Sequence, residues 1–286
     1  MKTNAIVRII LFSLALLILG SVLLGVIAFG LFSFDFRNSE SEHHISSEMT
    51  GNSMQFHPGD FCAIDIKWVA GSITVLPGTE DWITVEESHV SDNKYAMHVT
   101  QSGDTLSIQF CQESISYIGI NDNEFEAKDL LITVPAGWVC DSLEIDAAAA
   151  DVEISDLTIR EVEFDGASAV CGFHNCQVEK LDVDTVSGDV TFSGALEVLD
   201  FDAMSARFNG AFLNVPQGID LNSMSGNLQI SLPEDTGFAL SLNTISGDFS
   251  SDFPVNTVNN RYECGNARCQ INVSTMSGDV DIQKNN

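Results

Sequence analysis

Residues 181–192 read LDVDTVSGDVTF, and this stretch is the clearest copy of a unit that recurs along most of the chain. Similar units begin at residues 143, 162, 199, 219, 240 and 271, and a more distant one begins at residue 64. Most successive units are about 20 residues apart, which is too short for a repeated pair of helices and suits one coil of a β-solenoid. The repeat therefore predicts an all-β, single-stranded β-solenoid.

Each unit alternates apolar and polar residues, which is the pattern of a half-buried strand. Leu181 and Val183 point to one side of the strand, while Asp182 and Asp184 point to the other. Stacked units should share one continuous core, because a single unit cannot bury its apolar face alone. The expected core columns are Leu181, Leu199, Ile219 and Leu240; Val183, Phe201, Leu221 and Leu242; and Val190, Phe208, Leu228 and Phe249.

In four of the units a Ser-Gly pair separates two short strands, and an aspartate follows it in three of these four. Glycine accepts backbone angles that other residues resist, so the pair predicts a corner. No lysine follows the glycine as a phosphate-binding loop requires, and Asp or Asn at a corner can bond to turn backbone without a metal. The residues to which we give this structural role are Ser187, Gly188, Asp189, Ser225, Gly226, Ser246, Gly247, Asp248, Ser277, Gly278 and Asp279.

The chain leaves the repeat after its first coil, residues 61–75. Further strand patterns with turn signals between them predict an antiparallel meander that extends or caps the stack. These patterns lie at residues 83–87, 95–100, 105–110 and 130–134. A second excursion, residues 252–269, separates the final two units, so we expect residues 271–282 to form the end of the stack.

An uncharged stretch at residues 9–34 is long enough to span a bilayer as one helix. Lys2 and Arg8 precede it and acids follow it, so the positive-inside rule places the N-terminus in the cytoplasm and the rest outside. The alternative is a signal peptide cleaved after the small-residue site at residues 26–28. The expected organisation is a cytoplasmic N-terminus (1–8), a transmembrane signal anchor (9–34), a polar linker (35–59) and the solenoid domain (60–283).

The composition is strongly acidic, with 41 Asp and Glu against 12 Lys and Arg and a net charge of -29. Phosphate groups would be repelled by such a chain, which argues against nucleic acid as a partner. The same charge argues against docking on anionic lipid.

Acidic residues occupy the outward positions of the first strand in successive units. One column is Glu144, Glu163, Asp182, Asp200 and Asp220, and the next is Asp146, Asp165, Asp184 and Asp202. Neighbouring strands lie about 4.8 Å apart, and like charges at that spacing repel. Two Ca²⁺–oxygen bonds span a similar distance, so the second column is a candidate calcium site. The alternative is a solvated acidic face that keeps the sheet from aggregating.

Seven cysteines are present. Cys264 and Cys269 bracket four residues that include Gly265 and Asn266, so a hairpin could place them opposite each other as a disulfide. An extracytoplasmic location would permit oxidation. The alternative is two reduced thiols in a hairpin, and the absence of a Cys-x-x-Cys pair speaks against a zinc or redox site.

The motifs occur in a distinctive order: an apolar anchor, an early GSI strand pair, a DTLSI strand (104–108), an LLITVP strand (130–135) and serial SGDV coils. In this order they resemble the bacterial adhesin-like family called Toastrack, domain of unknown function 4097, over residues 61–282. The resemblance implies a β-solenoid domain of the bacterial cell envelope, and it carries no catalytic residues because the activity of the family is largely unassigned. Residues 168–170 and 205–207 depart from the SGD motif, which speaks against the motif as a binding signature.

The leading functional hypothesis is a non-catalytic, membrane-anchored, extracytoplasmic adhesin-like or sensory interaction domain without a cofactor. Its partners would be the membrane, through residues 9–34, and an unidentified envelope protein or glycan. The alternatives are a structural envelope spacer and a β-solenoid polysaccharide-active enzyme. Paired carboxylates, which a glycoside hydrolase uses, are abundant here, but the outward period explains nearly all of them. A lyase also needs a basic residue near its carboxylates, and residues 143–251 offer only Arg160, Lys180 and Arg207. No Gly-x-Ser-x-Gly or His-Glu-x-x-His motif occurs.

Overall fold

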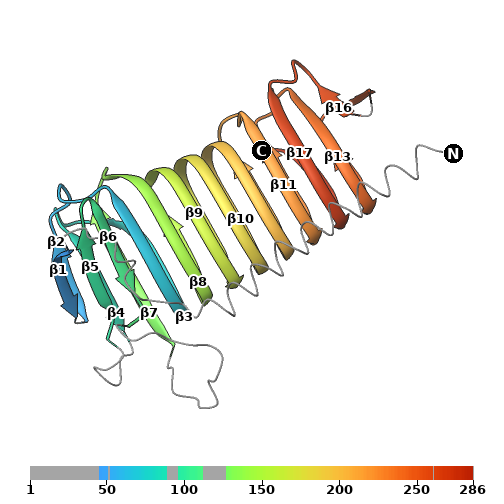
Figure 1. Ribbon diagram of the computed structural model, residues 1–286. Helices are drawn as coiled ribbons and strands as arrows, with labels where there is room; N and C mark the ends of the chain where they lie inside the picture. The colour runs from blue at the N-terminus through green and yellow to red at the C-terminus, as the bar shows by residue number, and fades with distance from the viewer. Residues whose placement is uncertain (1–44, 51, 89–95, 112–126, 260, 286) are drawn as a thin grey trace, which may run out of the picture.

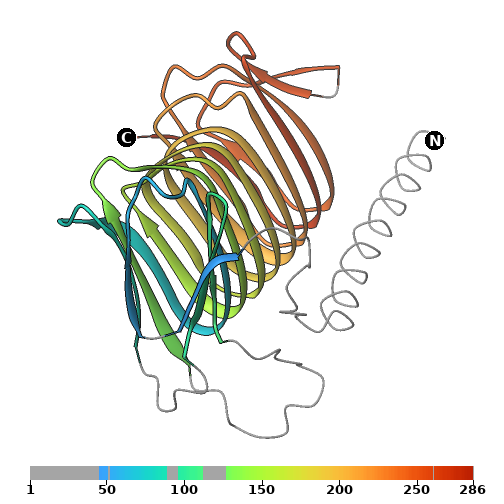
Figure 2. The same ribbon diagram turned by 60° about the vertical axis from the view of Figure 1, so that its left-hand side comes forward.

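A computed structural model of the protein describes residues 45–50, 52–88, 96–111, 127–259 and 261–285. These residues form strands and turns, arranged as a row of stacked coils (Figure 1). The turned view shows the coils wrapping around one shared interior (Figure 2). The predicted all-β solenoid is therefore confirmed, whereas the predicted membrane segment lies outside the described residues.

The strands are β1 (Ile45–Thr50), β2 (Ser53–Phe56), β3 (Ala63–Gly78), β4 (Ile83–Ser88), β5 (His98–Ser102), β6 (Thr105–Gln109), β7 (Lys128–Pro135), β8 (Val139–Ser155), β9 (Thr158–Ser168), β10 (Cys171–Phe212), β11 (Gly218–Ser225), β12 (Leu228–Leu232), β13 (Phe238–Ser246), β14 (Phe249–Ser251), β15 (Asn256–Val258), β16 (Arg261–Cys264), β17 (Cys269–Ser277) and β18 (Val280–Lys284). The longest of them, β10, runs without a break through successive sides of the coil.

Successive coils pair in parallel and in register. Leu143 of β8 pairs with Val162 of β9, and Val162 pairs with Leu181 of β10. Further along the same strand, Leu199 of β10 pairs with Ile219 of β11. Equivalent residues of successive units are therefore stacked in columns, as the repeat predicts.

The apolar columns form the core of the stack. Val183 and Leu221 are both 0% exposed, whereas Asp184 is exposed and Asn222 is half-buried. The predicted inward and outward sides of the strands are therefore confirmed. Full burial of a leucine or phenylalanine side chain contributes roughly 1.5–3 kcal/mol, so stability is distributed over the whole length of the stack.

The meander caps one end of the stack. β3 lies between β8 on one side and β6 and β7 on the other, so the meander stacks against the first coil. β4 and β5 run antiparallel to β7 and β6, and β2 and β1 then extend this end. Residues 45–50 and 53–56 were expected in the polar linker, but here they pair with β5 and β4. Backbone hydrogen bonds join these two segments to the sheet. Their polar sequence shows little of the apolar alternation that marks the other strands, so it gives no strand signal.

A buried ion pair lies in this cap, and sequence reasoning missed it. The Lys128 side chain is 2% exposed, and its Nζ lies 2.7 Å from Oε2 of Glu87. The same Nζ donates to the carbonyl oxygen of Phe110 at 2.5 Å and lies 4.0 Å from the centroid of that ring. Burial lowers the pKa of Lys128, and the carboxylate of Glu87 offsets only part of this decrease.

The last coil of the sequence is an interior coil of the structure. β17 pairs with β11 on one side and with β13 on the other, so Ile271 lies between Ile219 and Leu240. β18 likewise pairs with both β12 and β14. The expectation that residues 271–282 end the stack is therefore wrong. The excursion at residues 252–269 carries the chain over the outermost coil and back, and its hairpin β15–β16 pairs with the start of β13.

The glycines of the Ser-Gly pairs lie at corners, as predicted. Gly188 and Gly226 have φ angles of 128° and 138°, which only glycine adopts without strain. A Cβ on Gly226 would lie 1.9 Å from the carbonyl oxygen of Ala206 in the neighbouring coil. The corner acids also bond between coils: the carboxylate of Asp279 accepts a 2.9 Å hydrogen bond from the backbone N–H of Asp248. The expected bonds within each turn are thus replaced here by a bond between coils.

Candidate functional site

The first strands of the coils carry a continuous acidic face. Parallel register stacks Glu144 on Glu163, and it stacks Asp146, Asp165 and Asp184 in a row. The acidic face is defined here as one column of Asp65, Glu144, Glu163, Asp182, Asp200 and Asp220 and a second column of Asp146, Asp165, Asp184 and Asp202. All the carboxylates that the sequence placed in these columns share one face of the sheet.

Local strand geometry explains why these side chains face outward. Side chains alternate along a strand, so the neighbours of each acid point into the core. Phe164 and Val183 are 0% exposed, and they alternate with Glu163, Asp165 and Asp184 along their strands. A shift of one residue would bury the carboxylates, so the core fixes the position of the acidic face.

Two charged residues at the capped end of this face were missed by sequence reasoning. Asp65 and Lys67 of β3 lie in register with Glu144 and Asp146. The Nζ of Lys67 is 2.8 Å from Oδ2 of Asp146 and 3.7 Å from Oδ1 of Asp65. The distant unit at residue 64 contained this signal, because its second outward position is a lysine where later units have aspartate. Lys67 therefore closes the second acidic column with a positive charge.

Burial and mutual repulsion raise several pKa values on the acidic face. The pKa of Asp165 is raised to about 7, first by burial and then by the charges of Asp146 and Asp184. The side chain of Asp184 reaches solvent, but the surrounding chain desolvates its carboxyl in part; this desolvation, with the charges of Asp202 and other neighbouring acids, raises its pKa to about 6. Burial also raises the pKa values of Asp65, Glu144, Glu163, Asp200 and Asp202. At neutral pH Asp165 and Asp184 are therefore close to the point at which they take up protons.

These shifts predict that the protein is less stable in mildly alkaline than in mildly acidic solution. The folded state holds protons on Asp165 and Asp184 up to pKa values of about 7 and about 6, whereas the ordinary pKa of an aspartate is 3.8. Folded protein thus binds more protons than unfolded protein, so this stability is present below about pH 4 and is lost as pH rises toward 7. We expect a higher melting temperature at pH 5 than at pH 8.

Calorimetric melts across this pH range would measure the effect. Asp165→Asn should flatten the pH dependence, whereas the exposed Glu179→Gln, outside the acidic face, should leave it unchanged. A melting temperature that rises steadily from pH 5 to pH 8 would contradict the shifts on this face.

The carboxylates form a row rather than a cage. Within the described ranges, no group of three or more His, Cys, Asp or Glu side chains is arranged to hold a metal ion. Ca²⁺ takes six to eight oxygen ligands around one point, whereas the second column spreads its oxygens along a flat sheet. The calcium site expected at Asp146, Asp165, Asp184 and Asp202 stays a prediction, which thermal melting with calcium against magnesium and EDTA would test.

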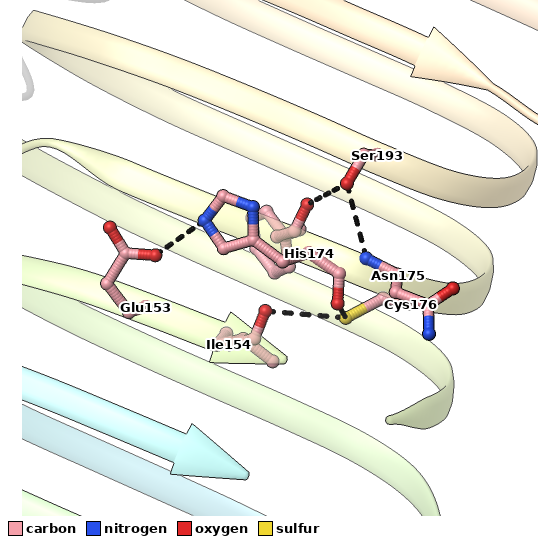
Figure 3. A network of polar contacts seen from close by, with 7 residues as sticks. Glu153, Ile154, His174, Asn175, Cys176 and Ser193 are labelled. Carbon is pink, nitrogen blue, oxygen red and sulfur yellow. Dashed lines mark hydrogen bonds and ion pairs between the residues drawn. The ribbon is translucent and has the colours of Figure 1, made fainter. Parts of the chain in front are cut away.

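A polar network on another side of the coil contains a histidine, a carboxylate and a serine (Figure 3). Nε2 of His174 lies 2.6 Å from Oε2 of Glu153, and both side chains are about half exposed. The Ser193 hydroxyl donates to the carbonyl oxygen of Phe173 at 3.4 Å and accepts from the N–H of Asn175 at 3.2 Å. The serine thus bonds to backbone of the neighbouring coil rather than to the histidine. This arrangement joins neighbouring coils, and the serine in it makes no hydrogen bond to the histidine.

A family model matches nearly all of the solenoid. The model for Toastrack, domain of unknown function 4097, matches residues 61–197 and again residues 197–283. The chain belongs to the Toastrack family. The two matches meet at residue 197, inside β10, so the boundary between them falls within one continuous strand of the Toastrack solenoid.

Solved structures that match this Toastrack chain share little sequence with it. A candidate adhesin from Bacteroides fragilis is 14% identical, with 82% of this chain and 97% of that chain covered and a TM-score of 0.47. A candidate cell adhesion protein from Clostridium sporogenes is 11% identical, with 84% and 99% covered and a TM-score of 0.37. A candidate lipid-binding protein from Parabacteroides distasonis is 13% identical, with 82% and 98% covered and a TM-score of 0.30. No curated protein matches the chain.

The Toastrack fold keeps the two cysteines of the expected hairpin apart. Phe238 of β13 pairs with Cys264 on one side and with Cys269 on the other, so β13 runs between the two thiols. Two strand spacings are about 9.5 Å, which exceeds the roughly 7 Å between Cα atoms that a disulfide spans. Both residues are thiols, and the predicted disulfide is corrected to two separated, buried side chains.

Thiol burial leads to a prediction about labelling. Cys264 and Cys269 are buried, and burial raises the pKa of Cys269 to about 12, whereas Cys62 is only half-buried. Because the thiolate is the reactive form, a maleimide should modify Cys62 first and the buried pair only after unfolding in guanidinium. Peptide mass spectrometry would follow each site, with Cys62→Ser as the control that removes the early product. A bridged Cys264–Cys269 peptide in native protein would contradict the structure.

No stretch of the described residues forms a helix that is long and apolar enough to cross a membrane. The predicted anchor at residues 9–34 stays a prediction, because it lies outside those residues.

Proposed function

We propose that this Toastrack chain is a non-catalytic interaction module of the bacterial cell envelope. The solenoid lies outside the cell, and residues 9–34 hold it in the membrane with the N-terminus in the cytoplasm. Its acidic face binds a cationic partner, such as a protein or peptide surface rich in lysine and arginine. The observation that carries this proposal is the unbroken row of in-register carboxylates on interior coils.

The energetic cost of the acidic face supports this proposal. Like charges directly opposite on neighbouring strands destabilise a sheet, and Glu144 faces Glu163 just as Asp146 faces Asp165. Protection of an open edge does not account for them, because β9 is paired on both sides, with β8 and with β10. A cationic surface would relieve the repulsion and would be attracted by the strongly negative potential of this face. Features that weaken a fold locally and serve no packing role are typical of binding sites.

The distribution of basic side chains favours binding over a lyase reaction, which needs a free base. Lys180 contacts Glu161 at 2.9 Å and Asp182 at 3.4 Å, and Arg160 contacts Asp141 at 2.8 Å. Both bases therefore already neutralise carboxylates of the chain. A structural spacer, the second candidate, would show no preference for cationic partners.

Binding of poly-lysine to the full chain in mild detergent tests the proposal. We compare a variant with Asp182→Asn, Asp184→Asn, Asp200→Asn and Asp202→Asn with a control that carries Glu179→Gln, Asp189→Asn, Glu234→Gln and Asp235→Asn. Both variants lose the same charge, but only the first loses it on the acidic face. We expect the dissociation constant to rise at least tenfold for the first variant and little for the control. Equal weakening would assign the binding to net charge alone, and no binding by the parent chain would favour the spacer.

Protease treatment of intact cells tests the proposed topology. The solenoid lies outside the cell in this proposal, so added protease should degrade residues 60–283 while a cytoplasmic marker stays intact. Degradation that occurs only after the cells are lysed would place the domain on the inner side and exclude an envelope partner.

A further inference from the structure

The two ends of the solenoid are finished differently. At the end formed by the meander, four antiparallel strands cover the stack, and Trp68 and Phe110 pack edge to face with their centroids 5.0 Å apart. At the opposite end β13 and β14 form the outermost coil (Figure 1). At this end β16 covers only a short part of β13, residues 238–240. Among the described residues, residues 241–246 of β13 pair on one side only, with β17.

The outermost coil exposes side chains that every interior coil buries. Leu242 lies in the column of Leu221 and Val273, and Phe249 lies in the column of Leu228 and Val280. The interior members of both columns are at most 1% exposed, whereas Leu242 and Phe249 are only partly buried. Nearby Ile245 is 54% exposed. The β15–β16 hairpin covers part of this end by packing Tyr262 on Phe249, with ring centroids 4.5 Å apart.

Charge disappears from the acidic columns at this end. Asp220 is followed in its column by Asn272 and then by Ser241. In the second column Asp202 is followed by Asn222, Ser274 and Asn243. β13 and β14 contain no charged residue. Free sheet edges are usually protected by charged residues or proline, and here an uncharged edge follows a row of acids.

We propose that residues 241–246 of β13 pair with the same segment of a second copy of this chain, antiparallel and around a two-fold axis. The chain carries a net charge of -29, so two copies repel each other over most of their surfaces. Residues 241–246 carry no charge, so this edge is a place where two copies can meet with little repulsion. The contact is isologous, since each copy offers the same edge to the other. The inference goes beyond the proposed function and does not depend on the acidic face.

The shape of the edge limits how two copies can meet. β16 occupies the edge up to Leu240, and the corner glycine Gly247 turns the chain away after Ser246. In an antiparallel pair the corner of one copy lies near the point where β16 covers β13 of the other copy. The β15–β16 hairpins of the two copies therefore lie on either side of the contact. Because facing residues must point to the same side of the sheet, the axis passes through Asn243 or Thr244. Leu242 of each copy then lies against the exposed end of the other core.

Crosslinking of the full chain in mild detergent tests the contact. Asn243→Cys places a thiol at or beside the axis, and a short bis-maleimide should join two chains carrying it. The matched control is Asn222→Cys, which puts a thiol at the same outward position of an interior coil. Both variants keep the seven native cysteines, so a dimer specific to Asn243→Cys identifies this edge.

Sedimentation measurements on the full chain give the second readout. We expect a concentration-dependent dimer, with Asn243→Asp raising its dissociation constant at least tenfold because two carboxylates then meet at the axis. Asn222→Asp adds the same charge away from the edge and should have little effect. A chain that is monomeric at every concentration would overturn the proposal and leave the edge to a strand of another protein. A dimer that Asn243→Asp does not weaken would place the contact elsewhere and overturn it as well.

Discussion

Replacing Leu221 with alanine is expected to lower the free energy of unfolding by roughly 2–5 kcal/mol, because it leaves a cavity in a close-packed core. Leu221 is 0% exposed and lies between Phe201 of β10 and Val273 of β17, which are also buried. Neighbouring coils hold both partners in place, so the core cannot easily collapse around the missing methyl groups. Denaturant unfolding monitored by circular dichroism would measure the change.

Asp184→Asn is the comparison that tests the register. Asp184 points outward from the strand and faces other acids, so its replacement should cost little and can add stability by removing repulsion. If Asp184→Asn destabilised the protein more than Leu221→Ala, the inward and outward sides of the strands would be exchanged.

Replacing the corner glycine Gly226 with alanine is the second change with a large expected effect. The new Cβ would lie 1.9 Å from the carbonyl oxygen of Ala206, at a φ of 138°. Backbone strain of about 1–3 kcal/mol and overpacking of about 1–3 kcal/mol add to a loss of roughly 2–6 kcal/mol. The obstacle is backbone rather than a flexible side chain, so the corner must move to make room.

Gly218→Ala is the matched control in the same coil. A Cβ at Gly218 meets nothing within 4 Å, and the backbone there has no positive φ. The control should therefore keep the free energy of unfolding, measured with urea, within about 0.5 kcal/mol of the parent, as exposed substitutions usually do. Similar losses for both variants would mean that glycine content, and not the corner, sets the stability.

The repeat pattern was sufficient to predict the coil, its corners and its two faces. Alternation assigns a side to every residue of a strand, which is why Val183 is buried and Asp184 exposed as expected. The Ser-Gly pair marks the corners because positive φ angles favour glycine. Both signals are local, and each is repeated in many units, so one strong copy such as residues 181–192 supports the weaker ones.

The order of the coils could not be predicted in the same way. Every unit offers the same apolar columns, so the coil at residues 271–282 fits beside residues 219–230 as well as at the end of the stack. The separation of Cys264 from Cys269 follows from that order, because β13 enters between their strands. The Lys128–Glu87 pair was missed for another reason: its two partners are far apart in sequence, and no periodic pattern connects them.

The interior position of the last coil also determines when the domain can be completed. A chain is synthesised from its N-terminus, so β13 and β14 emerge before β17 and β18, which separate them from β11 and β12. A nascent chain that stops before residue 269 therefore lacks the two strands that join the outermost coil to the rest. Its unpaired strands would expose apolar columns and free edges, which are typical targets of chaperones and proteases. Docking of the outermost coil onto the stack therefore depends on residues 269–284, which follow it in the chain.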